Sequence, residues 1–393
     1  MTDTLWITPG YPWREEPAVG VFYRTQARAV ARLGRSVTVC APTPWAPWPL
    51  PLMRPRWRLH AATPTLADDG DVTVVRPRYP NAPGEPTWAR PDRLIARAAW
   101  GSRKSWSGAK VIHGHFAITG LAAWRLARRA HLPFVLTFHG SDMNSWPDEH
   151  PERLADLRAA VRDASAVIAV SAALADRISD VTGVQAIHLP IGSDHQALRA
   201  AALPRGEARQ LLGLPDDRVV VLFVGNLKPT KGIRELADAL LGLGDPFLGV
   251  FVGGGVESGY GSGDPRAPGR LSYVGARPHE DVVRYLSAAD VLVLPSYLEG
   301  LPTVIVEAGS LGVPVIASDV GGVPELLGHD RGAILPDVSA TAIATALNGF
   351  VADRAGAAAA ARRLADFVVD SYDVDRNAAR LVDYYRAAER GAT

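Results

Sequence analysis

Residues 291–308 read VLVLPSYLEGLPTVIVEA, and this stretch decides the fold class of the chain. The apolar run 291–294 has the length of a buried strand, and an apolar helical pattern begins near Pro302. Proline suits the first position of a helix, because its missing N–H would have no partner there. The stretch therefore predicts a buried parallel strand, a loop at its carboxyl end, and a helix that runs back along the sheet.

Short apolar runs and amphipathic stretches alternate along the rest of the chain, a pattern typical of βαβ units. A first series predicts strands at 4–7, 36–41, 72–76, 110–113, 133–138 and 166–169, with helices at 21–33, 118–131 and 151–163. A second series predicts strands at 219–224, 247–252, 271–274, 291–294 and 313–317, with helices at 233–241, 279–288, 302–311 and 340–352. The fold class is therefore α/β.

The two series predict two domains, each a doubly wound parallel sheet of the Rossmann type. We place the amino-terminal domain at 1–195 and the carboxy-terminal domain at 196–369, and 393 residues suit two domains. A last helical pattern within 370–393 is expected to pack back on the first domain. Because ligands bind at the carboxyl edge of such sheets, we expect the two edges to face each other across a cleft.

Composition excludes several classes of protein. Hydrophobic residues make up 47%, and 42 Lys and Arg against 41 Asp and Glu give a net charge of +1, which argues against a general nucleic-acid binder. Cys40 is the single cysteine, no run of about 18 apolar residues occurs, and the first residues lack a signal-peptide pattern. No Asp-x-Asp pair follows a strand, so we expect no metal. These features favour a cytoplasmic protein.

The loop and helix of 295–308 predict an anion site. The first amides of the helix, at Thr303 and Val304, and the helix dipole would face the anion, with Gly300, Leu301 and Pro302 shaping the approach. Glu299 precedes the helix, and Glu307 lies about 7.5 Å farther along its axis than Pro302. Two carboxylates with an anion between them suit a nucleotide sugar. The alternative is that Glu299 caps the helix and Glu307 is solvated.

Two further loops of the second series follow strands. The segment VGNLKPTKG at 224–232 places Lys231 at a helix start, where its ammonium would reach the same anion, with Asn226 and Lys228 close by in sequence. Solvated lysines are the alternative, although the chain has only four lysines. The loop 253–263 is rich in glycine, and Gly253 and Gly254 would let its backbone approach a ligand closely.

In the first series, His139 follows the strand 133–138 and is expected at the ligand-binding edge, where it would donate a hydrogen bond to a phosphate or sugar oxygen. Gly20, which ends the first loop, would let a helix start approach the ligand. A structural role is favoured for His113 and His115. No such setting is predicted for the remaining candidates, His188, His195, His279 and His329.

The segment 44–60 reads PWAPWPLPLMRPRWRLH and breaks the alternation, because it is too rich in proline for a central strand or helix. Its tryptophans and arginines have the composition of a membrane-interface surface. The alternative is a proline-stiffened loop whose tryptophans pack on their own domain.

Taken together, these residues resemble the retaining glycosyltransferases of family 4, which have the GT-B fold of two Rossmann-like domains. The resemblance covers nearly the whole chain, from the first loop through TFHGSD at 137–142 and VGNLKPTKG to EGLPTVIVEA at 299–308. The Glu-x7-Glu spacing of Glu299 and Glu307 is its most specific feature. The opening GYPWREEPAVGVFYRTQ at 10–26 looks like the branch that includes teichuronic-acid and capsule polysaccharide transferases.

The resemblance implies a role for each residue. Glu299 would bind hydroxyls of the donor sugar, Glu307 the ribose, Lys231 the diphosphate, and His139 the sugar and the transition state. The chain departs from the family at Asn226, where members commonly carry arginine. Asparagine donates hydrogen bonds without a charge, so more of the phosphate recognition would fall to Lys231, with Lys228 as partial compensation.

The implied activity is that of a hexosyltransferase-type enzyme. It would move a sugar from a nucleotide-diphosphate sugar to a glycan, lipid-linked or small-molecule acceptor, with retention of configuration and without a metal or other cofactor. It would work in the cytoplasm, with peripheral contact at the inner face of the plasma membrane through 44–60. Two other functions stay open: a GT-B-type sugar-nucleotide epimerase, and a non-catalytic nucleotide-binding partner subunit.

Overall fold

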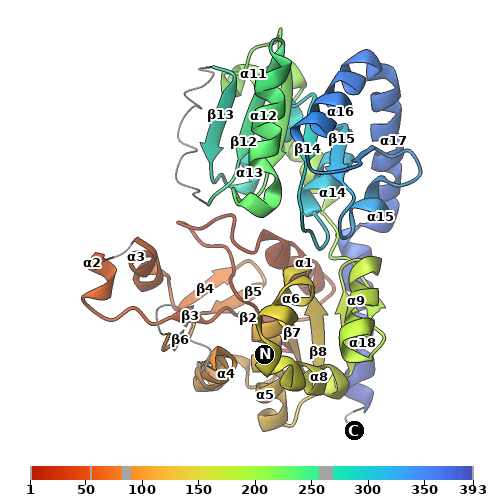
Figure 1. The fold of residues 1–393 in the computed structure, drawn as a ribbon. Helices are drawn as coiled ribbons and strands as arrows, with labels where there is room; N and C mark the ends of the chain where they lie inside the picture. The colour runs from red at the N-terminus through yellow and green to blue at the C-terminus, as the bar shows by residue number, and fades with distance from the viewer. Residues whose placement is uncertain (1, 54, 82–89, 256–268, 392–393) are drawn as a thin grey trace. The chain divides into compact units, whose positions relative to one another are not determined.

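The computed structural model describes residues 2–53, 55–81, 90–255 and 269–391. The chain divides into two compact units, of which the first comprises Met1–Ile191 and Val374–Thr393 and the second Gly192–Asp373 (Figure 1). The domain boundaries predicted from the sequence, after 195 and after 369, lie a few residues from these. Each unit contains one main sheet with its own core.

The first unit contains strands β1 (Thr4–Ile7), β2 (Val37–Cys40), β3 (Thr43–Pro44), β4 (Leu66–Asp69), β5 (Val72–Val75), β6 (Arg78–Tyr79), β7 (Val111–His115), β8 (Phe134–Phe138), β9 (Ala166–Ala169) and β10 (Ile187–His188). In its described part the main sheet has the order β10-β9-β8-β7-β1-β2-β5-β4. The pairs from β10 to β5 are parallel, whereas β4 runs antiparallel to β5. Strands β3 and β6 pair separately.

The helices of the first unit are α1 (Val21–Arg32), α2 (Leu50–Met53), α3 (Pro55–Ala62), α4 (Pro91–Gly101), α5 (Ala117–Ala130), α6 (Ser141–Asn144), α7 (Trp146–Glu149), α8 (Leu154–Asp163), α9 (Ala172–Thr182) and α18 (Val374–Gly391). The last of these returns to the first unit and packs beside α1. Its apolar face, which includes Leu381 and Tyr385, joins the core around Trp6 and Tyr23. Arg32 and Asp375 add an ion pair of 2.6 Å between the two helices.

The second unit contains strands β11 (Val219–Val224), β12 (Phe247–Val252), β13 (Leu271–Gly275), β14 (Val291–Leu294), β15 (Val315–Ser318) and β16 (Ala333–Leu335). They form a parallel sheet in the order β13-β12-β11-β14-β15-β16. Its helices are α10 (His195–Ala201), α11 (Arg205–Leu212), α12 (Ile233–Leu243), α13 (His279–Ala288), α14 (Thr303–Ser310), α15 (Val323–Leu327), α16 (Ala340–Ala352) and α17 (Arg354–Ser371). Helix α12 packs beside α16, and α14 beside α17 (Figure 1).

The strand order of the second unit determines where its ligand crevice lies. The chain moves outward on one side from β11 to β13 and then returns to add β14 on the other side of β11. In an open parallel sheet, ligands bind at the carboxyl ends of the strands where this reversal occurs. By this rule we expect a ligand beside the two loops that follow β11 and β14, and they are the loops that carry Lys231 and Glu299.

The proline-rich segment 44–60 forms α2 and most of α3 rather than a loop without helices. Its tryptophans divide between two environments, because Trp57 is buried at 9% exposure whereas Trp45 and Trp48 are 55% and 81% exposed. Leu52 and Met53 are also exposed, at 68% and 69%. The segment thus anchors itself through Trp57 and leaves apolar side chains in solvent. Among the described residues, no helix has the length and apolar character needed to cross a membrane.

Candidate functional site

The loops after β11 and β14 lie in direct backbone contact. The Tyr297 amide donates to the Thr230 carbonyl at 2.9 Å. Gly232, which precedes α12, has φ 64°, and a Cβ at this position would lie 2.0 Å from the Pro295 carbonyl oxygen. Such a distance is far inside van der Waals contact, so only glycine allows the two loops to approach this closely.

This contact brings Lys231 and Glu299 together, although they are far apart in the sequence. Lys231 Nζ lies 2.7 Å from Glu299 Oε1 and 3.3 Å from the Leu298 carbonyl oxygen. Ser296 Oγ donates to the same carboxylate oxygen at 2.7 Å. Both charged side chains are largely buried. Glu299 therefore does not cap the following helix, and Lys231 is not a freely solvated lysine.

Helix α14 begins beside this ion pair. Pro302 is the N-cap residue and Thr303 opens the helix, which therefore begins one residue later than the sequence predicts. The Pro302 carbonyl accepts from Ile305 N at 3.0 Å, so the amides of Thr303 and Val304 precede the first intrahelical bond. Within the described residues neither amide has a backbone or side-chain acceptor. Two N–H groups and the positive end of the helix dipole are thus available to an anion.

The second carboxylate of this helix has a partner that the sequence analysis missed. Glu307 Oε1 lies 3.1 Å from Nε2 of His279, the first residue of α13, and Glu307 is largely buried rather than solvated. The sequence analysis did not predict this contact of His279 with a candidate site residue. The signal was available, because His279 opens a helix that follows the loop after β13, at the same edge of the sheet.

The glycines after β12 bring the neighbouring loop close. A Cβ on Gly253 would lie 1.7 Å from the Gly225 carbonyl oxygen, and the Gly254 carbonyl accepts from Leu227 N at 2.8 Å. Asn226 and Lys228 are exposed on this loop. The rest of the predicted glycine-rich loop, 256–263, lies outside the described residues.

The remaining predicted positions of the second unit belong to the loop after β14. The Gly300 carbonyl accepts from Gly322 N at 2.7 Å, and Leu301 is half-buried against the core of the unit. A Cβ on Gly321 would lie 2.3 Å from the Glu299 carbonyl oxygen. The segment after β15 therefore supports the loop that carries Glu299 from the other side.

His139 directly follows strand β8 of the first unit, as the sequence predicts. Asp142 fixes its backbone by accepting from His139 N at 3.0 Å and from Gly140 N at 2.7 Å. Burial raises the pKa of Asp142 to about 7, against the opposing effect of these amide donors. The Phe116 ring stacks on the His139 imidazole with centroids 4.5 Å apart. His139 is thus held at its backbone and at its ring.

The two histidines of β7 differ in their contacts. His113 is structural, because its Nδ1 lies 2.6 Å from Tyr385 Oη and its Nε2 2.7 Å from Thr137 Oγ1. His115 Nδ1 lies 3.1 Å from His139 Nε2. Burial lowers the pKa of His139 to about 3 and holds the pKa values of His113 and His115 well below the ordinary value. All three imidazoles are therefore neutral at pH 7.

Gly20 occupies the N-cap position of α1 with φ 70°. A Cβ at this position would lie 2.7 Å from the Tyr23 ring and 2.9 Å from the Gly10 carbonyl oxygen. Glycine is thus required both for the left-handed backbone and for the close packing of the first loop on the helix start.

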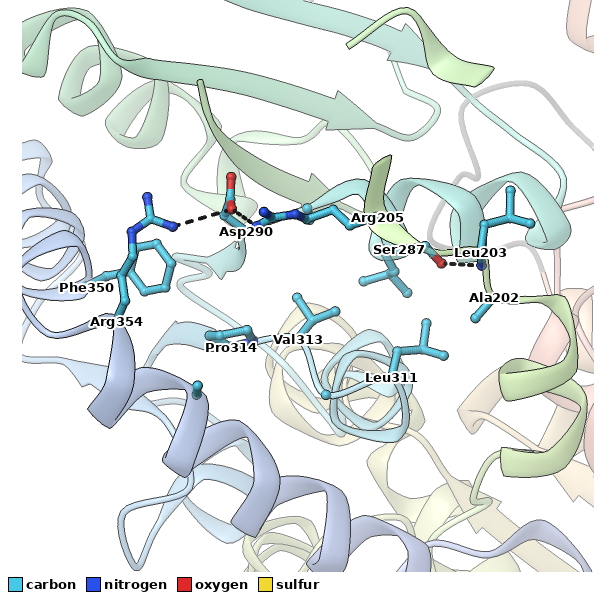
Figure 2. A pocket seen from close by; sticks show the side chains of 14 residues that line it. Ala202, Leu203, Arg205, Ser287, Asp290, Leu311, Val313, Pro314, Phe350 and Arg354 are labelled. Atoms are coloured by element: carbon cyan, nitrogen blue, oxygen red, sulfur yellow. Dashed lines mark hydrogen bonds and ion pairs between the residues drawn. The ribbon is translucent and has the colours of Figure 1, made fainter. Parts of the chain in front are cut away.

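A cavity of about 400 Å³ in the second unit lies at the opposite edge of the sheet, near the amino ends of β14 and β15 (Figure 2). Asp290 lies at its wall and accepts from Arg205 at 2.8 Å, from Arg209 at 2.6 Å and from Val220 N at 2.7 Å. The carboxylate is fully engaged by these donors and connects α11 to the sheet. The cavity is therefore separate from the loops that carry Lys231 and Glu299.

Models of two protein families match successive parts of the chain. "Glycosyltransferase Family 4" matches residues 19–191, and "Glycosyl transferases group 1" matches residues 204–366. The chain is 35% identical over 388 residues to TuaC of Bacillus subtilis, named as a teichuronic acid biosynthesis glycosyltransferase, with 98% of each chain covered. It is 30% identical to the D-inositol 3-phosphate glycosyltransferase of Streptomyces scabiei, with 73% of this chain and 71% of the other covered.

Solved structures show the same fold. Sucrose-phosphate synthase from Thermosynechococcus elongatus superposes with a TM-score of 0.80 at 22% identity, and 100% of both chains are covered. HepE of Anabaena, solved in complex with UDP-glucose, superposes with a TM-score of 0.70 at 20% identity over 98% of this chain and 99% of the other. By the likeness of its whole sequence to TuaC and by its GT-B fold, the chain belongs to family 4 of the glycosyltransferases.

Proposed function

We propose that this glycosyltransferase takes its sugar from a nucleotide-diphosphate sugar and transfers it to a glycan, lipid-linked or small-molecule acceptor. The observation that carries the proposal is the ion pair of Lys231 and Glu299, which joins the loops after β11 and β14 just before the helix start whose Thr303 and Val304 amides have no acceptor among the described residues. A cation and two free N–H groups suit a diphosphate, and a carboxylate beside them suits sugar hydroxyls. HepE, which shares the fold, was solved with UDP-glucose.

Each group has a chemical task in this proposal. Lys231 and the first amides of α14 hold the diphosphate, and Glu299 accepts hydrogen bonds from hydroxyls of the sugar. Glu307, oriented by His279 at 3.1 Å, accepts hydrogen bonds from the ribose. Asn226 and Lys228 add donors at the exposed end of the same loop, and Gly253 and Gly254 give the nucleotide close access to the backbone.

The chemical step follows from how charge develops. When the glycosidic bond to the diphosphate breaks, negative charge grows on the leaving phosphate oxygen and positive charge on the sugar ring. Donors that are already in place stabilise the leaving group without reorganisation. His139, a neutral imidazole, donates a hydrogen bond to the sugar or the phosphate. The acceptor attacks from the face that the leaving group vacates and gives its proton to the phosphate, which retains the anomeric configuration.

Metal-independent catalysis is part of the proposal. The groups that meet the phosphate charge are an ammonium and backbone amides rather than carboxylates that would hold Mg²⁺. Among the described residues, no group of three or more His, Cys, Asp or Glu side chains is arranged to hold a metal ion.

We place the protein in the cytoplasm, at the inner face of the plasma membrane. The support is the exposed apolar group formed by Trp45, Trp48, Leu52 and Met53, which is followed by the exposed Arg56 and Arg58. Tryptophan and leucine side chains insert between lipid headgroups, and arginines favour the anionic lipids of the cytoplasmic leaflet.

The test is a thermal-shift panel of UDP-, GDP- and ADP-sugars, followed by sugar transfer with the nucleotide sugar that binds. Binding to the native state raises the melting temperature, and at equal ligand concentration a tighter ligand raises it more, so the panel also identifies the base and the sugar. Glu299→Gln should remove transfer without unfolding the protein. Epimerisation of the bound sugar without an acceptor, or the absence of a shift with every nucleotide sugar, would contradict the proposal.

A further inference from the structure

The two ring nitrogens of His139 lie in different surroundings. Nε2 lies 3.1 Å from His115 Nδ1, inside the first unit. No described residue forms a hydrogen bond with Nδ1, and His139 as a whole is only half-buried. Nδ1 is therefore the nitrogen that a ligand can reach. Whether it carries a proton decides whether His139 offers a donor or an acceptor.

The partner of Nε2 decides this question. Both imidazoles are neutral, because burial lowers their pKa values, so the pair shares a single bridging proton. If the bridging proton were on His139 Nε2, the proton of His115 would have to be on His115 Nε2. That atom is buried and has no hydrogen-bond partner among the described residues. Buried N–H groups without an acceptor are rarer in proteins than acceptors without a donor. The proton therefore belongs on His115 Nδ1.

We propose that His115 is a positioning residue that holds His139 as the Nδ1–H tautomer, so that His139 presents a hydrogen-bond donor to the substrate. His115 donates from Nδ1 to His139 Nε2, and the proton of His139 consequently resides on the reachable nitrogen. The proposal rests on the proposed role of His139 in sugar transfer. A donor at this position suits the oxygens of a phosphate or a sugar, which accept hydrogen bonds.

The backbone next to His115 fixes the ring plane of His139. Phe116 has φ 65° and ψ 163°, a region that residues other than glycine almost never occupy. Its ring nevertheless stacks on His139 at an interplanar angle of 19°. Strain of this kind persists only where the surroundings impose it, and it concentrates at functional sites. His115 and Phe116 thus restrict the tautomer and the tilt of the same imidazole.

The tautomer can be measured directly, without any substrate. The ring ¹⁵N and ¹³C shifts of selectively labelled histidine report which nitrogen is protonated, and His139→Asn identifies the signal. We expect Nδ1–H in the wild type and a mixture of tautomers in His115→Ala. His115→Asn should restore Nδ1–H, because its side-chain amide can donate from nearly the same place. The proposal would be overturned if His139 were protonated at Nε2 in the wild type, or if its tautomer were the same in His115→Ala as in the wild type.

His113→Gln is the matched control. His113 is equally buried, but it bonds to Tyr385 and Thr137 and not to His139, so its loss should lower stability without moving the His139 signal. A changed tautomer in this control would mean that general packing, and not His115, sets the proton.

Kinetics provide the second measurement. His115→Ala should lower kcat about 2- to 10-fold, as expected for one hydrogen bond, with little change in KM for the nucleotide sugar, and His115→Asn should recover most of it. Equal losses in His115→Ala and His115→Asn would count against the positioning role. A protein with His139 protonated at Nδ1 that transfers no sugar would instead contradict the proposed function, so the two failures are distinguishable.

Discussion

Lys231 Nζ lies 2.7 Å from Glu299 Oε1, across a contact between two loops whose residues are far apart in the sequence. The two groups that we assign to the diphosphate and to the sugar therefore neutralise each other's charge within the protein. A diphosphate that engages Lys231 must compete with this carboxylate. In the proposed site, part of the binding energy is therefore spent on rearranging this ion pair, and the rearrangement frees Glu299 for the sugar hydroxyls.

Replacing Lys231 by alanine should weaken binding of the matching nucleoside diphosphate about 10- to 150-fold. The reason is the loss of one charged hydrogen bond of roughly 1.5–3 kcal/mol. Isothermal titration calorimetry measures the change. Lys104→Ala, at an exposed position of the first unit, is the control and should bind as the wild type does. An unchanged affinity in Lys231→Ala would contradict the assignment of Lys231 to the diphosphate.

Replacing Gly232 by alanine should destabilise the second unit by more than about 2 kcal/mol. The left-handed backbone alone costs a non-glycine residue about 1–2 kcal/mol, and the new Cβ would also overlap the Pro295 carbonyl oxygen. Gly213→Ala is a matched control, because Gly213 has φ 65° but no atom within 4 Å of an added Cβ. Urea denaturation measures both variants. Equal losses of unfolding free energy in Gly232→Ala and Gly213→Ala would show that the contact between the loops is not tight.

The strands were predictable where apolar runs are bounded by turn residues. Strands β11, β12 and β14 begin and end at the predicted residues, because fully buried parallel strands consist of continuous apolar sequence. Strand β4 was missed, since its sequence LADD is polar and half of it is exposed. Helix α17 was missed as well, because its alanine-rich sequence lacks a clear apolar period.

The candidate site was predictable as separate loops and not as contacts. Each loop that follows a strand carries its own signal, so Lys231, Glu299 and the start of α14 could be predicted one at a time. The ion pair depends on the reversal of strand order between β11 and β14, which no local pattern encodes. His279 and Phe116 were missed for the same reason. Each contacts a candidate site residue that is distant in sequence, Glu307 in one case and His139 in the other.

Acid should destabilise the first unit from about pH 6.5 downward. Burial lowers the pKa of His139 to about 3 and those of His113 and His115 well below the ordinary value, so the unfolded chain takes up protons in a range where the folded chain does not. The unfolding free energy therefore falls as the pH falls, by up to about 1.4 kcal/mol per histidine and pH unit. Asp142 partly offsets this, because burial raises its pKa to about 7 and the folded chain takes up one proton in the same range.

Urea unfolding at pH 7.5 and 5.5 measures this slope. All ten tryptophans of the chain lie between residues 6 and 146, so their fluorescence reports on the first unit alone. His113→Gln should reduce the slope, whereas His329→Gln, at an exposed position of the second unit, should not change it. Equal stability at the two pH values would mean that these histidines titrate normally.

Sugar transfer should continue in EDTA at the rate measured without it. In the proposed site the phosphate charge is met by Lys231 and the amides of α14, so removal of divalent ions leaves the stabilising groups in place. Initial rates after dialysis against EDTA, with and without added Mg²⁺, provide the measurement. A complete loss of activity that Mg²⁺ reverses would contradict metal-independent transfer.

Binding to anionic vesicles should depend on the exposed side chains of 45–53. Trp48 and Leu52 are 81% and 68% exposed, and burying two such groups in lipid is worth several kcal/mol when complete, so Trp48→Ser with Leu52→Ser should weaken binding at least about tenfold. Arg56→Gln and Arg58→Gln should remove the preference for anionic over neutral vesicles, because each arginine contributes about 1 kcal/mol near a negative surface. Leu211→Ser, at a leucine of the second unit that is 59% exposed, should bind as the wild type does. Vesicle co-sedimentation measures the binding of each variant. Full binding by the variant that combines Trp48→Ser with Leu52→Ser would exclude this segment as the membrane contact.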